Sequence, residues 1–409
     1  MSNVYKFYRY TKKQGIGKAF RKTVLYAAKK ARIAKRTIDV MVDIDDIVAA
    51  DFHNHPYIRP MAIKKGHLTI AWVLSPVSPG SGGINTITRF ANFLQKQGHL
   101  VTIYIYEGVH PQSASEAKKI LLNHFNLDVV VREIAEYTSS DVIIATGWET
   151  AYPVFNLQTS AHKFYFVQDY EPFFYGVGSK TVLAENTYKM GFYGITAGKW
   201  LAHKLNTEYS MKTDYFDFGV DVDVYRPKDI LNIQKQKKII FYARPVTERR
   251  AFELGIISLE VFHRKHPEYI IELFGWDVGD YNIPFPYVNR GILPQGELAI
   301  LYQQSVACLV LSLTNVSLLP LELLASGCIP VINEGDNNEM VLGSNDHIRY
   351  SPASPVQLAD ELVSAVTNTN LLVEARNASK SVHSITWESS YAKVETILKR
   401  EVAKVEATT

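Results

Sequence analysis

The segment from Leu313 to Val331 reads LTNVSLLPLELLASGCIPV and carries the pattern that decides the fold. The apolar run Ala307–Ser312 just before it predicts a buried strand, and the small polar residues that follow predict a loop. Pro320–Ser326 predicts a helix that ends at Gly327, and Ile329–Ile332 predicts the next strand. A strand, a helix and another strand in this order indicate a βαβ unit with parallel strands.

The same alternation extends through most of the chain. The second half adds expected strands at Lys238–Ala243 and Tyr269–Phe274, and helices at Ala251–His266, Gly296–Gln304, Pro355–Thr367 and about 385–404. The first half has expected strands at Leu68–Leu74, Val101–Tyr106, Leu127–Val131, Val142–Thr146, Lys163–Gln168 and Gly194–Thr196, with helices at Ile84–Gln97, Ser113–His124 and Lys199–Leu205. This rhythm predicts an α/β protein with two Rossmann-like, doubly wound domains that face a central cleft.

Changes of composition set the expected domain boundaries. A chain of 409 residues fits two domains of about 150 residues with extensions. We expect an N-terminal extension and connector at 1–66, a first domain at 67–225, a second domain at 226–384 and a last helical segment at 385–409. A linker between the domains is expected at Phe218–Pro227.

The N-terminal extension is strongly basic. Residues 1–36 hold twelve Lys or Arg and no Asp or Glu, which leaves 32 basic and 41 acidic residues for the remainder. Apolar residues recur at helical spacing over 16–38, so an amphipathic helix with a basic face is expected there. Such an arm suits anionic lipid, nucleic acid or an acidic partner, and it could equally fold onto the acidic body of the protein.

The composition also bears on location. Only two cysteines occur, Cys308 and Cys328, both in apolar surroundings, which fits a reducing compartment better than a disulfide framework. No apolar run approaches the ~18 residues of a membrane span, and no secretory signal follows the basic start. We therefore expect a cytoplasmic protein, with the basic arm at 1–38 as its means of reaching the inner face of a membrane or a partner enzyme.

A glycine-rich loop precedes the first helix of the first domain. The sequence Gly80-Ser-Gly-Gly83 lets backbone amides at a helix N-terminus approach an anion, which makes Gly82 and Gly83 candidates for phosphate binding. A tight turn without a ligand explains the loop equally well. A dinucleotide-binding fingerprint is a further alternative, because Glu107 lies about 24 residues on, but the spacing is not G-x-G-x-x-G.

Two arginines follow a strand of the second domain. In the segment FYARPVTERR, Arg244 comes just after the strand end and Arg249 lies at a helix start, so both can reach one point above the sheet. Guanidinium groups grip phosphate and neutralise charge on a departing diphosphate. The alternative is a surface ion pair between either arginine and Glu248.

The opening segment adds further candidates. Ser317 and Leu318 place backbone amides at a helix N-terminus, where phosphate oxygens bind. Glu322 lies one turn into an otherwise apolar helix, so its carboxylate needs a partner, and a sugar diol offers two hydroxyl donors. An internal salt bridge is the alternative for Glu322.

Carboxylates also close a strand of the first domain. Asp169 and Glu171 are candidates for orienting an acceptor hydroxyl or accepting its proton, although either could instead cap the following segment. Nearby aromatic residues, among them Trp148 and Tyr170, could offer faces to a sugar acceptor or belong to the core. The histidines show no metal-ligand spacing, and Asp221-Val-Asp223 lies in the linker, so no metal site is expected.

Together these segments resemble the GT-B glycosyltransferases, in particular the large retaining family 4. The resemblance implies that Gly291, Ile292 and Leu293 border the base of a nucleotide and that the last helix crosses back to the first domain. In two places the pattern differs, since Arg249 stands where the family has lysine and Thr314 stands where it has the first of two glutamates. The segments that carry the resemblance are Gly82–Gly83, the linker FGVDVDVYRP at 218–227, Ala243 to Arg250, Gly291 to Tyr302, and ITWE at 385–388.

Within this superfamily the chain resembles the WsaF-type rhamnosyltransferases of bacterial surface-layer glycan assembly. The basic arm, the segment QDYEPFFY at 168–175 and Thr314 carry this resemblance. It implies dTDP-L-rhamnose as the donor substrate and a rhamnose hydroxyl, on a lipid-linked or soluble glycan, as the acceptor. It implies retention at the anomeric carbon and no cofactor, metal or nucleic-acid partner.

The expected mechanism combines these residues. The diphosphate would be held by Gly82, Gly83, Arg244, Arg249, Ser317 and Leu318. Glu322 would bind the ribose, and Asp169 rather than Glu171 would lie near the acceptor hydroxyl. Rival hypotheses are a GT-B enzyme with a UDP or GDP donor, an NAD-binding oxidoreductase, and a non-catalytic scaffold.

Overall fold

A computed structural model describes residues 38, 40–108, 111–230 and 233–404 of the chain. The predicted amphipathic helix at 16–38 lies outside the described residues except for Ile38, so nothing here tests the helix or its proposed partners. Over the described residues, no helix is both long and apolar enough to cross a membrane.

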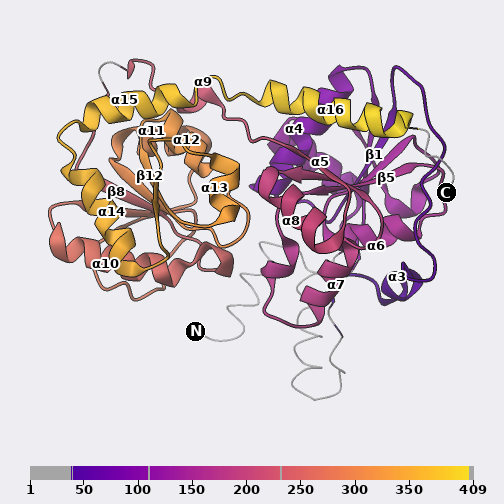
Figure 1. Cartoon of the computed structure of the whole chain (residues 1–409), viewed down its shortest axis with the longest axis horizontal. Helices are drawn as coiled ribbons and strands as arrows, with labels where there is room; N and C mark the ends of the chain where they lie inside the picture. Colours follow the sequence, from indigo (N-terminus) through magenta and orange to yellow (C-terminus); the bar gives the residue numbers. More distant parts are fainter. Residues whose placement is uncertain (1–37, 39, 109–110, 231–232, 405–409) are drawn as a thin grey trace, which may run out of the picture. The chain divides into compact units, whose positions relative to one another are not determined.

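The first sheet has seven parallel strands in the order β3-β2-β1-β4-β5-β6-β7 (Figure 1). The strands are β1 (Thr69–Leu74), β2 (Leu100–Ile105), β3 (Val130–Glu133), β4 (Val142–Ala145), β5 (His162–Val167), β6 (Tyr193–Ala197) and β7 (Thr213–Phe216). Its helices are α3 (Ile44–Ala49), α4 (Gly82–Lys96), α5 (Ala114–Phe125), α6 (Trp148–Asn156), α7 (Ser179–Thr187) and α8 (Lys199–Tyr209), with short 3-10 turns η1 (Ile134–Glu136) and η2 (Glu171–Phe174).

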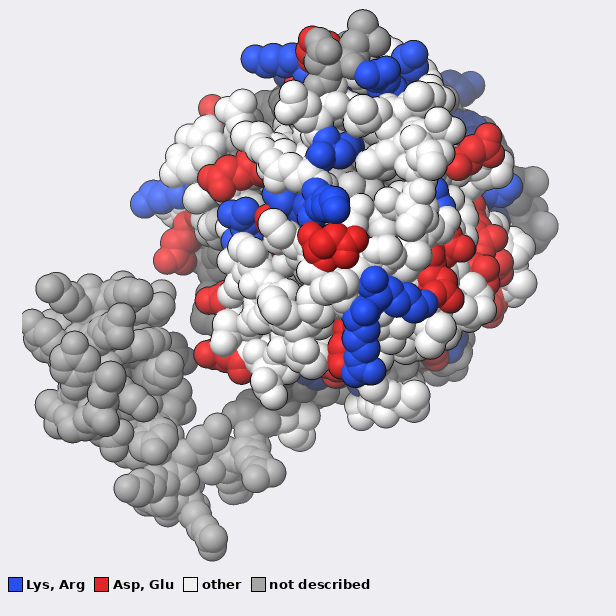
Figure 2. All heavy atoms as spheres, turned by 90° about the vertical axis from the view of Figure 1, so that its left-hand side faces the viewer, with Lys and Arg blue, Asp and Glu red and all other residues white. Residues whose placement is uncertain are grey.

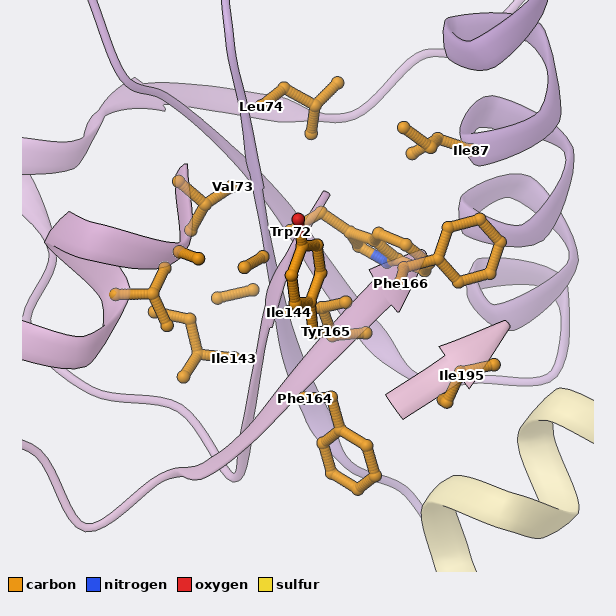
Figure 3. Packing of buried hydrophobic residues seen from close by; sticks show 14 of the residues in the cluster. Trp72, Val73, Leu74, Ile87, Ile143, Ile144, Phe164, Tyr165, Phe166 and Ile195 are labelled. Carbon is orange, nitrogen blue, oxygen red and sulfur yellow. The ribbon is translucent and has the colours of Figure 1, made fainter. Parts of the chain in front are cut away.

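The central strands are continuous apolar runs because both of their faces are covered. In β1, every residue from Ile70 to Leu74 is buried. Figure 3 shows Trp72 of β1 beside Phe166 of β5, and their ring centroids lie 5.3 Å apart in an edge-to-face arrangement. Such aromatic contacts fix the strands that end at the site described below.

The second sheet has six parallel strands in the order β10-β9-β8-β11-β12-β13. The strands are β8 (Lys238–Tyr242), β9 (Ile270–Phe274), β10 (Val288–Gly291), β11 (Ala307–Val310), β12 (Ile329–Asn333) and β13 (Arg349–Ser351). Around it lie η4 (Glu248–Arg250), α10 (Phe252–Lys265), α11 (Gln295–Gln304), α12 (Leu319–Ala325), α13 (Asp336–Leu342), α14 (Pro355–Thr367) and α15 (Leu371–Ser381). The expected α/β architecture with two doubly wound parallel sheets is confirmed. Figure 2 shows basic and acidic side chains interspersed over one face of the molecule.

One predicted strand was too long at its start. Residues 127–129 do not belong to β3, because Asn126 adopts a left-handed conformation and ends α5. The amide of Leu127 then bonds to the carbonyl of Leu121 rather than to a neighbouring strand. The strand therefore begins only at Val130.

Two chain segments connect the sheets and contact each other. One is the linker that holds α9 (Val222–Tyr225), and the other leads into α16 (Trp387–Ala403), which packs against α4 and β7 of the first sheet. The amide of Val220 donates to the carbonyl of Ile385 at 3.2 Å. A Cβ added at Gly219 would lie 2.5 Å from the backbone nitrogen of Trp387, so this contact requires a glycine.

The connection is also held by charge. The Arg89 guanidinium of α4 donates to both carboxylate oxygens of Asp221, at 2.9 and 2.5 Å, and lies over the ring of Trp387 at 5.2 Å. Such a two-point guanidinium–carboxylate contact fixes orientation as well as distance. Asp221 of the linker is therefore a structural partner of α4.

Candidate functional site

Asp169 joins the ends of the two sheets. It follows β5, and its Oδ1 accepts hydrogen bonds from the amides of Tyr170 and Asn315, both at 2.8 Å. Its Oδ2 accepts from Arg249 Nε and Thr314 Oγ1, both at 3.1 Å. Three of these four donors come from segments that follow strands of the second sheet, Arg249 after β8 and Thr314 and Asn315 after β11. Asp169 is 9% exposed, so its carboxylate is a nearly buried bridge between residues that the sequence places about 80 and 145 positions away.

The side chain of Asn315, which follows β11, also connects the two sheets. Its Nδ2 donates to the carbonyl of Gln168 at 2.9 Å and to the carbonyl of Ala197 at 2.8 Å. These carbonyls lie at the ends of β5 and β6. The side-chain Nε2 of Gln168 in turn donates to the carbonyl of Gly83 at 3.2 Å, which ties the start of α4 to the site.

A cluster of asparagines holds the loop that carries Thr314 and Asn315. Asn333 accepts from the amide of Ser312 at 2.8 Å and donates to its carbonyl at 3.0 Å. Asn337 also donates to that carbonyl, at 3.0 Å, and to the carbonyl of Thr314. Arg250 donates to Ser312 Oγ at 2.6 Å. The sequence analysis did not single out these asparagines, since no motif marked them.

The predicted arginines flank this junction. Arg249 lies in η4, and its guanidinium carbon is 4.0 Å from the ring centroid of Phe174. Arg244 follows β8, and its guanidinium carbon is 5.7 Å from the ring centroid of Trp276. Within the described residues, Arg244 Nε and Ser317 Oγ are buried and have no hydrogen-bond partner. Buried polar groups are nearly always paired, so two unpaired ones in a predicted phosphate site fit contacts to an anionic ligand.

Glu322 is the one acidic residue of α12, and burial raises the pKa of its carboxyl to about 7. A hydrogen bond with the Tyr225 side chain opposes this rise, and the nearby charge of Asp221 adds to it. No ion pair to Glu322 occurs within the described residues, so the salt-bridge alternative has no partner there. The carboxyl is therefore poised between its two protonation states near neutral pH.

A cavity of about 450 Å³ lies beside Arg244. It is lined by Trp276, Asp277, Asn289, Arg290, Gly291 and Ile292. Two of the three residues predicted to border a base thus line one cavity, and an aromatic ring forms part of its wall. Leu293 lines a separate cavity of about 150 Å³ with Glu297 and Ile300.

Three predicted site residues are structural instead. Trp148 is 0%, Tyr170 2% and Glu171 5% exposed, so none offers an open surface to a sugar. Glu171 Oε2 accepts from the amide of Trp148 at 2.5 Å and from the hydroxyl of Tyr165 at 2.8 Å. The amide of Trp148 is the first of α6, whose early amides have no partner within the helix. Glu171 therefore caps a helix, and burial together with the charge of Glu149 raises its pKa.

The predicted absence of a metal stays a prediction. Within the described residues, no three His, Cys, Asp or Glu side chains gather as a metal site requires. The Asp221 side chain is taken up by Arg89 and by Gln295, which donates to it at 3.3 Å.

Comparison with known proteins places these features in a family. Residues 103–197 match the N-terminal domain of WsaF, and residues 237–363 match the C-terminal domain of WsaF. The two matches together cover more than half of the chain. The chain belongs to the WsaF family. The WsaF-type resemblance seen in the sequence is thereby confirmed, and both matched ranges contain residues of the Asp169 junction.

One curated relative is named for O-antigen biosynthesis. The O-antigen biosynthesis protein RfbC of Myxococcus xanthus is 30% identical over 338 residues. The match covers 80% of this WsaF-family chain but 26% of that protein, so the chain spans about a quarter of the relative's length.

Solved structures show the same fold. The sucrose-phosphate synthase of Thermosynechococcus elongatus superposes with a TM-score of 0.62 at 13% identity, covering 82% of this chain and 99% of that one. HepE of Anabaena, solved in complex with UDP-glucose, superposes with a TM-score of 0.60 at 14% identity, covering 82% and 98%. The GT-B fold predicted from the sequence is confirmed.

Proposed function

We propose that the chain is a glycosyltransferase that transfers L-rhamnose from dTDP-L-rhamnose to a rhamnose-containing glycan in bacterial cell-surface polysaccharide synthesis. The observation that carries the proposal is the pair of unpaired buried groups, Arg244 Nε and Ser317 Oγ, in a GT-B fold with WsaF domains. The name of the relative RfbC supports the polysaccharide setting. The bound UDP-glucose of HepE supports a nucleotide sugar as the class of donor.

The donor would extend from the cavity to the Asp169 junction. The base would lie in the cavity against the ring of Trp276, beside Gly291 and Ile292. Arg244 would reach the diphosphate from the cavity side, and Ser317 from the start of α12. Glu322 would accept a hydrogen bond from the 3′-hydroxyl, the one free hydroxyl of the deoxyribose in dTDP, when its carboxyl is ionised.

Arg249 would hold the phosphate next to the transferred sugar. Asp169 engages the Nε of Arg249, so the remaining N–H groups of the guanidinium are directed by that contact toward the leaving group. Stabilising the negative charge that develops on the diphosphate lowers the barrier to its departure. In this role Asp169 is a positioning residue, because its oxygens already accept four hydrogen bonds.

The proposed reaction retains the configuration of the anomeric carbon. The bond between this carbon and the phosphate oxygen breaks, and a bond to the acceptor oxygen forms on the same face. The acceptor proton passes to the leaving phosphate oxygen, so that dTDP and the elongated glycan are the products. No protein base is needed in this scheme, which agrees with the structural role found for Glu171.

The proposal is tested by ligand binding followed by product analysis. A thermal-shift screen with dTDP, UDP, GDP and NAD should show the largest rise in Tm with dTDP. Mass spectrometry should then detect one added deoxyhexose on a synthetic rhamnoside incubated with dTDP-L-rhamnose. Transfer from a UDP or GDP sugar alone would replace the donor, and a shift with NAD alone would exclude this function.

Arg244→Ala provides the site-specific control. Loss of one charged hydrogen-bonding group should weaken dTDP binding by roughly 10- to 100-fold while leaving thymidine binding unchanged, because only the diphosphate contacts it. The matched variant is Arg264→Ala on α10, where the arginine side chain is 74% exposed and pairs with Glu260. Equal dTDP affinity in both variants would remove Arg244 from the site.

A further inference from the structure

The segment after β5 presents apolar side chains to solvent. Phe173 is 52% exposed, Phe174 is 37% exposed, and Val177 is fully exposed. We propose that this segment, Phe173 to Val177, is the acceptor subsite and that it seats the apolar face of a deoxyhexose. This inference rests on the proposed function and names the part of the site that selects the acceptor.

The ring of Phe173 and the backbone around Val177 are held by contacts. The ring of Phe173 packs edge-on against Tyr170, with centroids 4.7 Å apart. Beyond it, Thr181 Oγ1 donates to the carbonyl of Gly176 at 2.9 Å, and the amide of Val182 donates to the carbonyl of Gly178 at 3.1 Å. The backbone on both sides of Val177 is therefore bonded to α7 through the carbonyls of Gly176 and Gly178. This conformation leaves the Val177 side chain exposed.

The segment is continuous with the proposed diphosphate site. The ring of Phe174 lies 4.0 Å from the guanidinium carbon of Arg249, and η2 packs against η4. A sugar resting on Phe173 and Phe174 would therefore lie beside the phosphate that leaves. An acceptor has to be there for its hydroxyl to meet the anomeric carbon.

The polar groups around the rings favour a sugar over a lipid surface. The Lys204 ammonium lies 4.4 Å from the Tyr170 ring centroid and 5.7 Å from that of Phe173, and it pairs with Glu208 at 2.6 Å. Aromatic faces beside charged hydrogen-bonding groups match a molecule with C–H faces and hydroxyls. The methyl group of a 6-deoxyhexose adds apolar surface that Val177 can cover, which a 6-hydroxyl would not.

The test uses the full chain with Phe173→Ser and Val177→Ser, and Val373→Ser as the matched control. Val373 is equally exposed, at 52%, but lies on α15 at the second sheet. At saturating dTDP-L-rhamnose, Phe173→Ser should raise the KM for a synthetic trirhamnoside on the order of tenfold, with the donor KM unchanged. Val177→Ser should mainly reduce the preference for the trirhamnoside over its 6-hydroxylated analogue.

The other possible outcomes would contradict either the acceptor subsite or the proposed function. Unchanged acceptor KM in both variants overturns the subsite. Loss of binding to phosphatidylglycerol vesicles at an unchanged acceptor KM assigns the segment to a membrane instead. If the wild-type chain transfers no rhamnose, the proposed function fails, and saturation-transfer NMR of the trirhamnoside with the chain still tests the subsite. No contact with the wild-type chain, or equal contact with Phe173→Ser, then overturns it.

Discussion

Asp169 accepts a hydrogen bond from Arg249 Nε at 3.1 Å, and the two residues come from different sheets. The first stands at the end of a strand that was expected to face the acceptor, and the second lies in the expected diphosphate clamp. Their contact couples the position of the clamp to the position of the first domain. A GT-B enzyme that assembles its clamp only when the two domains meet gains a means of limiting hydrolysis of its donor.

A double-mutant cycle measures this coupling. Asp169→Ala, Arg249→Ala and the double variant should give a coupling on the order of 1 kcal/mol in the free energy of unfolding of the ligand-free chain. Of the two single variants, Asp169→Ala should be the less stable, because it also leaves the amide of Asn315 and the hydroxyl of Thr314 without their acceptor. Strictly additive effects would show that the contact contributes nothing.

The protonation of Glu322 predicts a pH dependence. Burial raises its pKa to about 7, above the ~4.3 of an unfolded glutamate, so the folded chain keeps this proton longer. The stability that the group contributes below pH ~4 is then lost progressively as the pH rises to about 7. Relative to Glu322→Gln, the wild-type chain should therefore lose stability across this range. Chemical unfolding of both proteins at several pH values measures it, and parallel curves would contradict the shift.

The same residue predicts the opposite trend for the ligand. If ionised Glu322 accepts a hydrogen bond from the deoxyribose 3′-hydroxyl, dTDP affinity should rise as the pH passes through about 7. Glu322→Gln should lack that rise and show only the change that comes from the diphosphate itself. Calorimetric titrations of both proteins between pH 6 and pH 8 measure the dTDP affinity. The expected change in affinity for the wild-type chain is ~10-fold or smaller.

Glu171 distinguishes a helix cap from a catalytic carboxylate. Glu171→Ala removes the acceptor of two buried donors and should cost about 1–3 kcal/mol for each of them. Glu171→Gln keeps a side-chain oxygen and should preserve both the fold and the rate of transfer. A folded Glu171→Gln variant whose kcat falls by orders of magnitude would restore this residue to the catalytic list.

The close approach of the linker to the last helix predicts a sharp glycine requirement. In Gly219→Ala, the new Cβ would lie 2.5 Å from the backbone nitrogen of Trp387, so the variant should lose roughly 1–3 kcal/mol of stability. Gly296→Ala in the first turn of α11 meets nothing within 4 Å and should be neutral or stabilising by about 0.5–1 kcal/mol. Thermal unfolding of the two variants provides the comparison.

The fold could be predicted from the sequence because apolar residues recur with the spacing of strands and helices, and because glycines mark the ends of helices. Apolar strands alternated with helices that ended at glycine, and residues such as Gly98 and Gly327 adopt the left-handed conformation that such ends require. Both sheets follow from that rhythm. The edge strands β7, β10 and β13 were missed, since they are short and only partly buried, and helix α6 was missed because it contains Pro153.

The site was harder to predict because its decisive contacts are long-range. Arg244 and Glu322 were predicted from their local setting, as a strand-end cation and a carboxylate in an apolar helix, and their roles stay predictions. Trp148 and Glu171 were misplaced, because an aromatic or a carboxylate near a strand end looks alike in sequence whether it points into the core or away from it. The bond from Asp169 to Asn315 spans 146 positions, and no local pattern reports such a distance.

The hydrogen bond from Val220 to Ile385 has a mechanical consequence. Two chain segments connect the sheets, and this hydrogen bond holds them side by side. Two connecting segments that are bonded to each other allow the two sheets to rotate about one axis and resist rotation about the others. Any such rotation that keeps this bond must change the contacts that Asp169 and Asn315 make between the two sheets. Opening of the junction would then require three hydrogen bonds to a single aspartate, from Arg249, Thr314 and Asn315, to break.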